Sequence, residues 1–172
     1  IATGRHMKRL CVLCVSILLV AASGVVSYEN ATTFKEMVDM RVKKRWKTPI
    51  SHPMMYRCIP KRWRTNRKFE AEIMGALVRK FPEFNTGDVV RVLFDTDHWN
   101  VSRDEFTGFI RNRYLFAHLI VPAERSGEYY IVWLDFYQRN RFLGYLYHEP
   151  QFRKLLGVDR IKKEHLDVTC TY

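Results

Sequence analysis

Apolar residues recur at helical spacing along most of the chain from Thr33 onward, and capping residues and prolines cut this pattern into pieces of ordinary helix length. Thr33-Phe34-Lys35-Glu36 forms a capping box, in which the threonine oxygen accepts a first-turn amide and the glutamate returns to the cap. A first helix therefore begins at Thr33 and ends before Pro49. A proline-containing connector over 48–60 leads to a second helix over 66–80.

The second half of the chain carries similar signals. Asn85 predicts a cap for a third helix over 85–94, and Ser102 to Glu105 is a second capping box that opens a fourth helix over 102–117. A fifth, aromatic helix covers 127–148, and short helical turns over 152–156 and 159–166 follow. Residues 131–137 also fit a buried strand, because short apolar runs are ambiguous, but 142–147 continue the helical face. The pattern predicts an all-α, up-and-down bundle of about five helices with a basic Pro-containing connector.

Residues 1–27 have the pattern of upstream residues followed by a secretory signal peptide. Residues 1–6 precede Met7, the pair Lys8-Arg9 follows, and an apolar run over 10–20 leads to small residues ending at Ser27. This run is too short to cross the ~30 Å hydrocarbon core of a bilayer. The alternative is a short buried core helix. We expect residues 28–172 to form a secreted, single helical-bundle domain.

Beyond residue 27, Cys58 and Cys170 are the two remaining cysteines. In an oxidising compartment such a pair most simply forms one disulfide. Closing a loop of about 100 residues removes ~4.7 kcal/mol of unfolded-state entropy in the chain-entropy model. The alternative is a nucleophilic thiol at Cys58. Asn30 and Asn100 begin sequons that allow glycosylation.

Basic residues concentrate in the stretch 41–68, which contains eleven Lys and Arg and no Asp or Glu, in a chain whose overall net charge is +11. We call this stretch the basic stretch. One interpretation is a solvated helix end and a loop that apolar residues hold against the bundle. The other is a binding surface for a polyanion, because uncompensated like charges repel one another until a partner relieves them. Its candidate binding residues are Arg41, Lys43, Lys44, Arg45, Trp46, Lys47, Arg57, Lys61, Arg62, Trp63, Arg64, Arg67 and Lys68.

Three partners fit the basic stretch: anionic membrane lipid, nucleic acid, and an acidic extracellular glycoprotein. Each Lys or Arg near an anionic membrane contributes ~1 kcal/mol, and indole rings suit the membrane interface. Nucleic acid is not expected as a partner of a secreted protein. Trp46 and Trp63 are either interfacial anchors or core residues.

The motifs of common catalytic sites are missing from the sequence: HExxH, GxSxG, GxxxxGK[ST] and paired CxxC. Asp95-Thr96-Asp97-His98 has metal-ligating side chains, but this composition is more typical of a capping turn. His118 and His148 are interpreted as ordinary core or surface histidines. We therefore expect neither an enzyme nor a cofactor or metal, and the alternative is an enzyme with an unrecognised site.

Three segments resemble the abalone sperm lysin family: Phe84 to Val90, Phe109 to His118, and Leu143 to Tyr147. The basic stretch looks more like the fusogenic acrosomal paralogue of lysin than like lysin. This resemblance implies a five-helix bundle released from the sperm acrosomal vesicle, which acts in fertilization without catalysis. The leading hypothesis is a protein that binds and perturbs membranes and mediates sperm-egg membrane fusion. The alternative is a lysin-type protein that binds egg-surface glycoprotein and dissolves the egg vitelline envelope.

Overall fold

The computed structural model describes residues 31–46, 55–142 and 146–171, with the backbone alone for Arg45, Trp46 and Phe142. Contacts divide the chain into a unit over 1–30 and a unit over 31–172. The predicted signal peptide, Asn30 and Lys47 lie outside the described residues.

Two of the expected helices are confirmed. Helix α2 (Phe34–Trp46) begins after Thr33, whose hydroxyl accepts the Glu36 amide at 3.0 Å. The Glu36 carboxylate accepts the amide and the hydroxyl of Thr32, each at 3.0 Å. Helix α3 (Arg67–Lys80) begins after Asn66, whose side-chain oxygen accepts two first-turn amides at 3.1 and 3.2 Å. Its predicted apolar face is buried: Phe69, Ile73, Ala76 and Leu77.

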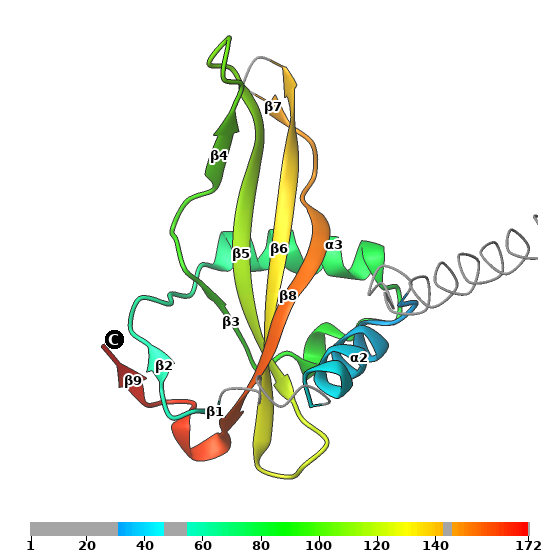
Figure 1. The fold of residues 1–172 in the computed structure, drawn as a ribbon, viewed down its shortest axis with the longest axis vertical. Helices are drawn as coiled ribbons and strands as arrows, with labels where there is room; N and C mark the ends of the chain where they lie inside the picture. The colour runs from blue at the N-terminus through cyan, green and yellow to red at the C-terminus, as the bar shows by residue number, and fades with distance from the viewer. Residues whose placement is uncertain (1–30, 47–54, 143–145, 172) are drawn as a thin grey trace, which may run out of the picture. The chain divides into compact units, whose positions relative to one another are not determined.

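The rest of the described chain is mainly sheet (Figure 1). In the larger sheet β1, β8, β6, β5 and β3 are neighbours in that order, while β4 pairs with β5 and β7 pairs with β6. The strands are β1 (Met55–Tyr56), β3 (Arg91–Phe94), β4 (Asn100–Arg103), β5 (Ile110–Pro122), β6 (Glu128–Phe142), β7 (Leu146–Tyr147) and β8 (Gln151–Lys162). All pairings in it are antiparallel except that of β1 with β8. A second, two-stranded parallel sheet joins β2 (Ile59–Pro60) to β9 (Thr169–Cys170).

The predicted all-α bundle of five helices is therefore wrong, and so is the five-helix fold that the resemblance implies. The segments 85–94, 102–117, 127–148, 152–156 and 159–166 contain strands and two short 3-10 turns, Thr86–Asp88 and Lys163–His165. Asn85 caps only the first of these turns, where its side-chain oxygen accepts the Gly87 amide at 3.0 Å. The strand interpretation of 131–137 is the correct one. Its β-branched and aromatic residues favour a pleated sheet.

Both faces of the larger sheet are covered, and this explains the helical appearance of the sequence. Leu119 lies opposite Val132 on the face that packs against α2 and α3, whereas Ile120 lies opposite Ile131 on the other face. Strand residues alternate between faces, so burial on both sides gives an uninterrupted apolar run. Such a run matches the helical period as readily as the strand period.

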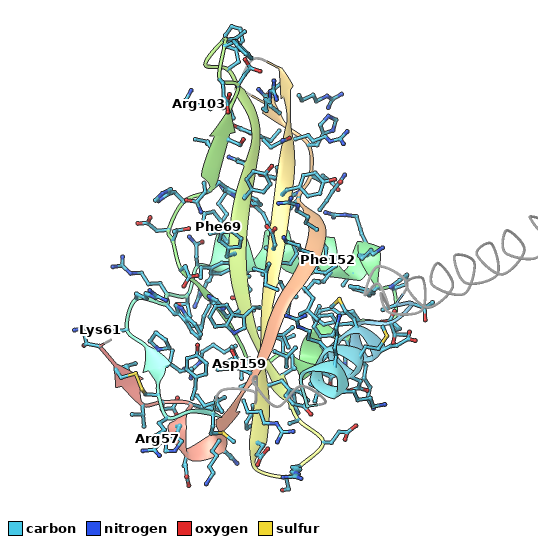
Figure 2. The ribbon with its side chains drawn as sticks, in the orientation of Figure 1. Arg57, Lys61, Phe69, Arg103, Phe152 and Asp159 are labelled. Atoms are coloured by element: carbon cyan, nitrogen blue, oxygen red, sulfur yellow. A yellow bond between two sulfur atoms is a disulfide. The ribbon has the colours of Figure 1, made fainter. Side chains whose placement is uncertain are left out.

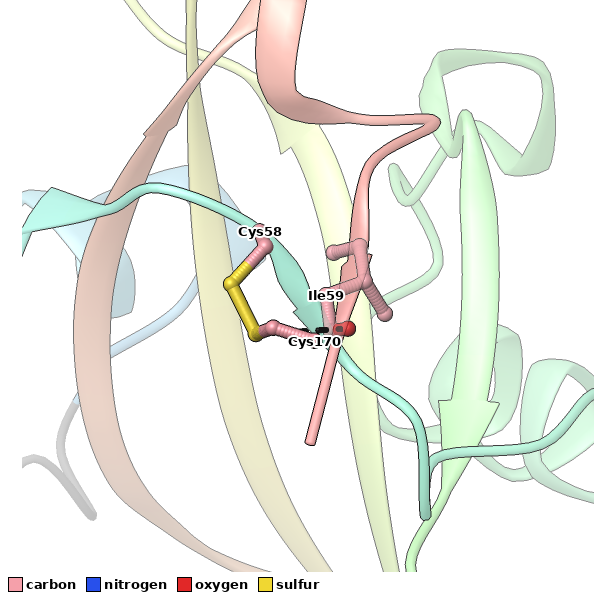
Figure 3. The surroundings of a disulfide bond; sticks show 3 residues. All are labelled: Cys58, Ile59 and Cys170. Atoms are coloured by element: carbon pink, nitrogen blue, oxygen red, sulfur yellow. Dashed lines mark hydrogen bonds between the residues drawn. A yellow bond between two sulfur atoms is a disulfide. The ribbon is translucent and has the colours of Figure 1, made fainter. Parts of the chain in front are cut away.

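The second face is covered by residues 55–64 and by the chain end. Residues 55–64 overlap the predicted connector over 48–60, and we call them the connector from here on. Tyr56, Ile59 and Trp63 pack there with Leu166 against the sheet. Cys58 and Cys170 form a disulfide across the β2–β9 pair, with their Cα atoms 5.8 Å apart (Figure 3). The predicted disulfide is thus confirmed, and it ties the connector to the chain end.

Candidate functional site

The basic stretch is divided between the two faces of the sheet. Lys43 and Lys44 are exposed near the end of α2, and Arg41 is half-buried, donating to the carbonyl of Leu156 at 2.9 Å. Helix α2 packs on one face of the sheet, and the connector covers the other. For Arg45 and Trp46, the structure describes the backbone but not the side chain. The bases of the connector and of the first turn of α3 are all exposed: Arg57, Lys61, Arg62, Arg64, Arg67 and Lys68.

Trp63 is a core residue. Its side chain is 5% exposed, and it stacks on His118 with ring centroids 3.9 Å apart. It also meets Trp133 edge-on at 5.6 Å. Of the two interpretations of this tryptophan, the structure supports packing rather than an exposed interfacial anchor.

A surface that the sequence interpretation missed lies at the end of the β4–β5 hairpin. We call residues 103–111 the hairpin tip. Phe106 is 96% exposed there and Phe109 is 55% exposed. Exposed apolar patches mark interaction sites, and these two phenylalanines supply exposed apolar surface at one end of the sheet. Figure 2 shows Arg103 at this end of the sheet, and Arg57 and Lys61 near the opposite end.

The Asp104 carboxylate makes several of the hydrogen bonds that hold the hairpin tip. Asp104 accepts the amides of Phe106 and Thr107 at 3.0 and 2.8 Å and the Thr107 hydroxyl at 3.0 Å. It also pairs with Arg111. The hydrogen bonds from Thr107, then that from Phe106, and the contact with Arg111 lower the pKa of Asp104 to about 2. Gly108 closes the turn with a φ of +70°, a conformation that favours glycine.

Several arginines lie at the same end of the sheet as the exposed phenylalanines. Arg103 donates to the carbonyl of Gly108 at 3.0 Å, and Arg111 neutralises Asp104. On the neighbouring strand, Arg139 lies opposite Asn112, and the Asn140 side chain donates to the Ile110 carbonyl at 2.5 Å. Arg139 and Arg141 are exposed. The hairpin tip and this end of β6 therefore combine exposed aromatic rings with several cationic groups.

Arg113 lies on β5, two residues after Arg111, and supports this end of the sheet. Its guanidinium lies 3.8 Å from the Tyr147 ring centroid and 5.0 Å from that of Trp99. Its Nε donates to the side-chain oxygen of Gln138 at 2.5 Å. Burial lowers the pKa of Arg113, an effect that Tyr147 and Glu72 partly offset. Arg113 thus joins β5, β6 and β7 behind the hairpin tip.

The loop over 95–98 does not gather its polar side chains on one point. Asp95 faces His118, with Oδ2 3.2 Å from Nε2, whereas Asp97 pairs with its neighbour His98 at 2.8 Å. Within 31–46, 55–142 and 146–171, no group of three or more His, Cys, Asp or Glu is placed to hold a metal ion. Asn100, the asparagine of the second sequon, is half-buried at the start of β4.

A local signal for the hairpin tip is present in the sequence. The segment Asp104 to Phe109 begins with Asp and has Gly108 near its end, and both residue types are typical of turns. The capping-box interpretation places Asp104 and Glu105 at a helix start, and it is wrong because the Asp104 side chain closes a hairpin turn instead.

Among the described residues, no helix is both long and apolar enough to cross a membrane. Comparison with protein-family models, curated proteins and solved structures finds no match for this chain.

Proposed function

We propose that this chain is a secreted protein that binds anionic membrane surfaces through the hairpin tip and acts by binding rather than by catalysis. The observation that carries this proposal is the exposure of Phe106 on a turn that is held by hydrogen bonds. An ordered turn loses little conformational entropy on binding, so the apolar surface that it presents is available for a partner.

The chemistry around Phe106 fits a bilayer of anionic lipids. Inserting a phenylalanine side chain into an apolar environment contributes ~1.5–3 kcal/mol. Each arginine held near the headgroups contributes ~1 kcal/mol more. Arg103, Arg139 and Arg141 are exposed at this end of the sheet and supply such charges. The exposed bases of the connector add a second cationic surface that attracts the protein to the same lipids.

The disulfide Cys58–Cys170 is consistent with an oxidising compartment and supports secretion. The role in gamete fusion and the alternative of envelope dissolution remain predictions that rest on the resemblance alone. Both need a surface that contacts an acidic partner, and the hairpin tip is a described surface where cationic and apolar groups occur together.

Vesicle co-sedimentation tests the proposal. The protein should sediment with vesicles of phosphatidylcholine and phosphatidylserine and much less with phosphatidylcholine alone. Phe106→Ser should weaken this binding about tenfold, the loss expected when a contact of ~1.4 kcal/mol disappears. Val168→Ser, at an exposed apolar residue near the chain end, is the matched control and should bind normally.

Insertion can be separated from adsorption with Phe106→Trp. Its fluorescence should be quenched by brominated lipids, because the new ring enters the acyl region. Equal binding by the wild type and Phe106→Ser would reject the hairpin tip as the site. Binding to a soluble polyanionic glycan but to neither vesicle would reject a membrane partner and favour an acidic glycoprotein.

A further inference from the structure

A cleft of about 310 Å³ lies between α2, the segment over 83–88 and the adjoining ends of β5 and β6. This volume is near the lower limit of small-molecule sites, which span roughly 300–1,000 Å³. The cleft is separate from the hairpin tip, because it adjoins the other end of β5, at Val121 and Pro122.

The floor of the cleft is apolar and aromatic. Phe34 and Phe84 meet edge-on with ring centroids 4.7 Å apart, and Val38, Val121 and Tyr130 complete the lining. Phe34 and Val38 are buried on α2, so their positions are fixed by packing. Such a floor accommodates an aromatic or branched aliphatic group of a few carbon atoms.

The rim of the cleft is acidic, although the whole chain carries a net charge of +11. Asp39, Glu83, Asp88 and Glu124 line it, with Lys35 as the opposing charge. Glu83 accepts the Phe34 amide at 2.7 Å, and Asp88 accepts the Asn85 side chain at 3.2 Å. Among the described residues, Asp39 and Glu124 have no ion-pair partner within 4.0 Å. These two carboxylates remain available to a cation.

We propose that this cleft binds a small organic cation, a primary amine attached to an aromatic or aliphatic body. The aromatic or aliphatic group of the amine packs on the floor formed by Phe34, Phe84 and Tyr130. Its ammonium group lies at the rim near Asp39 and Glu124. Opposite charges separated by about 4 Å attract with ~1 kcal/mol in water and ~4 kcal/mol near a protein surface. The electrostatics of the rim therefore favours an amine over a neutral or anionic molecule of the same size. This inference is independent of the membrane proposal.

Calorimetric titration with three probes of matched size tests the inference: 2-phenylethylamine, 2-phenylethanol and phenylacetate. The amine should bind about tenfold more tightly than the alcohol, the ratio that ~1.4 kcal/mol of charge attraction gives, and phenylacetate should bind most weakly. The double variant Asp39→Asn, Glu124→Gln should lose this preference and keep its affinity for the alcohol. Glu149→Gln, Glu164→Gln neutralises two exposed acids elsewhere and should behave as the wild type.

Circular dichroism of each variant confirms that the fold is intact before the titrations are compared. Equal or tighter binding of phenylacetate would overturn the inference, because Lys35 rather than the acids would then select the ligand. Failure of all three probes to bind, or an unchanged amine preference in the Asp39→Asn, Glu124→Gln variant, would also overturn it. None of these outcomes affects vesicle binding by the hairpin tip, so the two proposals fail separately.

Discussion

The imidazole of His118 stacks on the indole of Trp63, with ring centroids 3.9 Å apart and an angle of 13° between the planes. His118 is 1% exposed on β5, and its Nε2 lies 3.2 Å from Oδ2 of Asp95. Trp133 meets the His118 ring edge-on, with ring centroids 4.6 Å apart. This stack holds the connector on the sheet. The position of this basic segment is therefore fixed by the buried Trp63 ring rather than by its charges.

Trp63→Ala should lower the free energy of unfolding by ~3–5 kcal/mol, the usual cost of removing a large aromatic side chain from a core. Urea titration followed by far-UV circular dichroism measures this loss. Trp63→Phe keeps part of the stack and should lose less. A Trp63→Ala variant as stable as the wild type would show that the stack contributes little to folding.

Asp95 should make stability depend on pH in the acid range. Burial raises the pKa of Asp95, but His118, Arg62 and Trp63 together outweigh burial and lower the pKa below its ordinary value of 3.8. A lowered pKa in the folded state stabilises the protein above the unfolded pKa, and this contribution disappears as the pH falls through the folded pKa. Asp95→Asn should therefore be less stable than the wild type at pH 7, and the difference should shrink below about pH 4.

The urea midpoint measured across a pH series checks this prediction. Glu164→Gln, an exposed acid beside Lys162, is the surface control and should follow the wild-type curve. A constant difference between Asp95→Asn and the wild type at every pH would exclude the ionisation of Asp95 as the cause.

Reduction of the Cys58–Cys170 bond should destabilise the chain. The bond joins residues separated by 112 positions. In the chain-entropy model, a loop of about 100 residues gives up to ~4.7 kcal/mol. Cys58→Ser, Cys170→Ser should unfold at a lower urea concentration than the oxidised wild type. Mass spectrometry after alkylation without reduction verifies the bond, and labelled thiols at both positions of the native protein would contradict it.

The two N-terminal helices could be predicted because their signals are local. Thr33 and Asn66 accept first-turn amides, and the apolar residues of α3 form one stripe facing the sheet. A helix end depends on a few neighbouring residues, so the sequence contains the needed information. Strand pairing depends on distant residues: Leu119 is opposite Val132 only because β5 and β6 pair antiparallel.

The helix predictions are wrong for strands that are buried on both faces. Such strands lack the alternation of polar and apolar residues that usually identifies a strand. Leu115, Ala117 and Leu119 face the helices, while His118 and Ile120 face the connector. Since both sets are buried, no polar residue marks every second position through this part of β5. Aromatic and β-branched residues in β6 are the remaining strand signal, and they also fit the helical spacing.

The candidate site was only partly accessible to sequence analysis. The charge of the basic stretch is visible in the sequence, but its division between two faces is a consequence of tertiary packing. The exposure of Phe106 depends on Asp104 closing a turn rather than opening a helix. A turn and a helix N-terminus use the same residue types, such as Ser and Asp. The sequence alone therefore does not decide whether Asp104 closes a turn or opens a helix.

Asp104→Ala should weaken vesicle binding while Phe106 itself is retained. Without the carboxylate, the amides of Phe106 and Thr107 lose their acceptor, and the hairpin tip must be ordered when it binds. Because the pKa of Asp104 is lowered to about 2, the wild-type turn should keep its carboxylate ionised through the range in which vesicle binding is measured. Co-sedimentation at pH 5 and pH 7 checks both statements. Normal binding by Asp104→Ala would mean that a preformed turn is not required.

Two cationic surfaces, one beside the hairpin tip and one on the connector, can contribute to vesicle binding. Arg139→Gln, Arg141→Gln removes two exposed charges beside the hairpin tip, and Arg57→Gln, Lys61→Gln removes two from the connector. The two double variants carry the same net charge, so long-range attraction to an anionic vesicle falls equally in both. The variant near the hairpin tip should lose more binding, because its charges lie at the same end of the sheet as Phe106.

Co-sedimentation at low and high salt measures this difference, and binding of every variant should decrease as salt screens the charges. Equal losses would mean that net charge alone drives adsorption. A larger loss in the Arg57→Gln, Lys61→Gln variant would move the membrane contact to the connector, where the buried Trp63 cannot serve as an anchor, and the exposed phenylalanines would then need another partner.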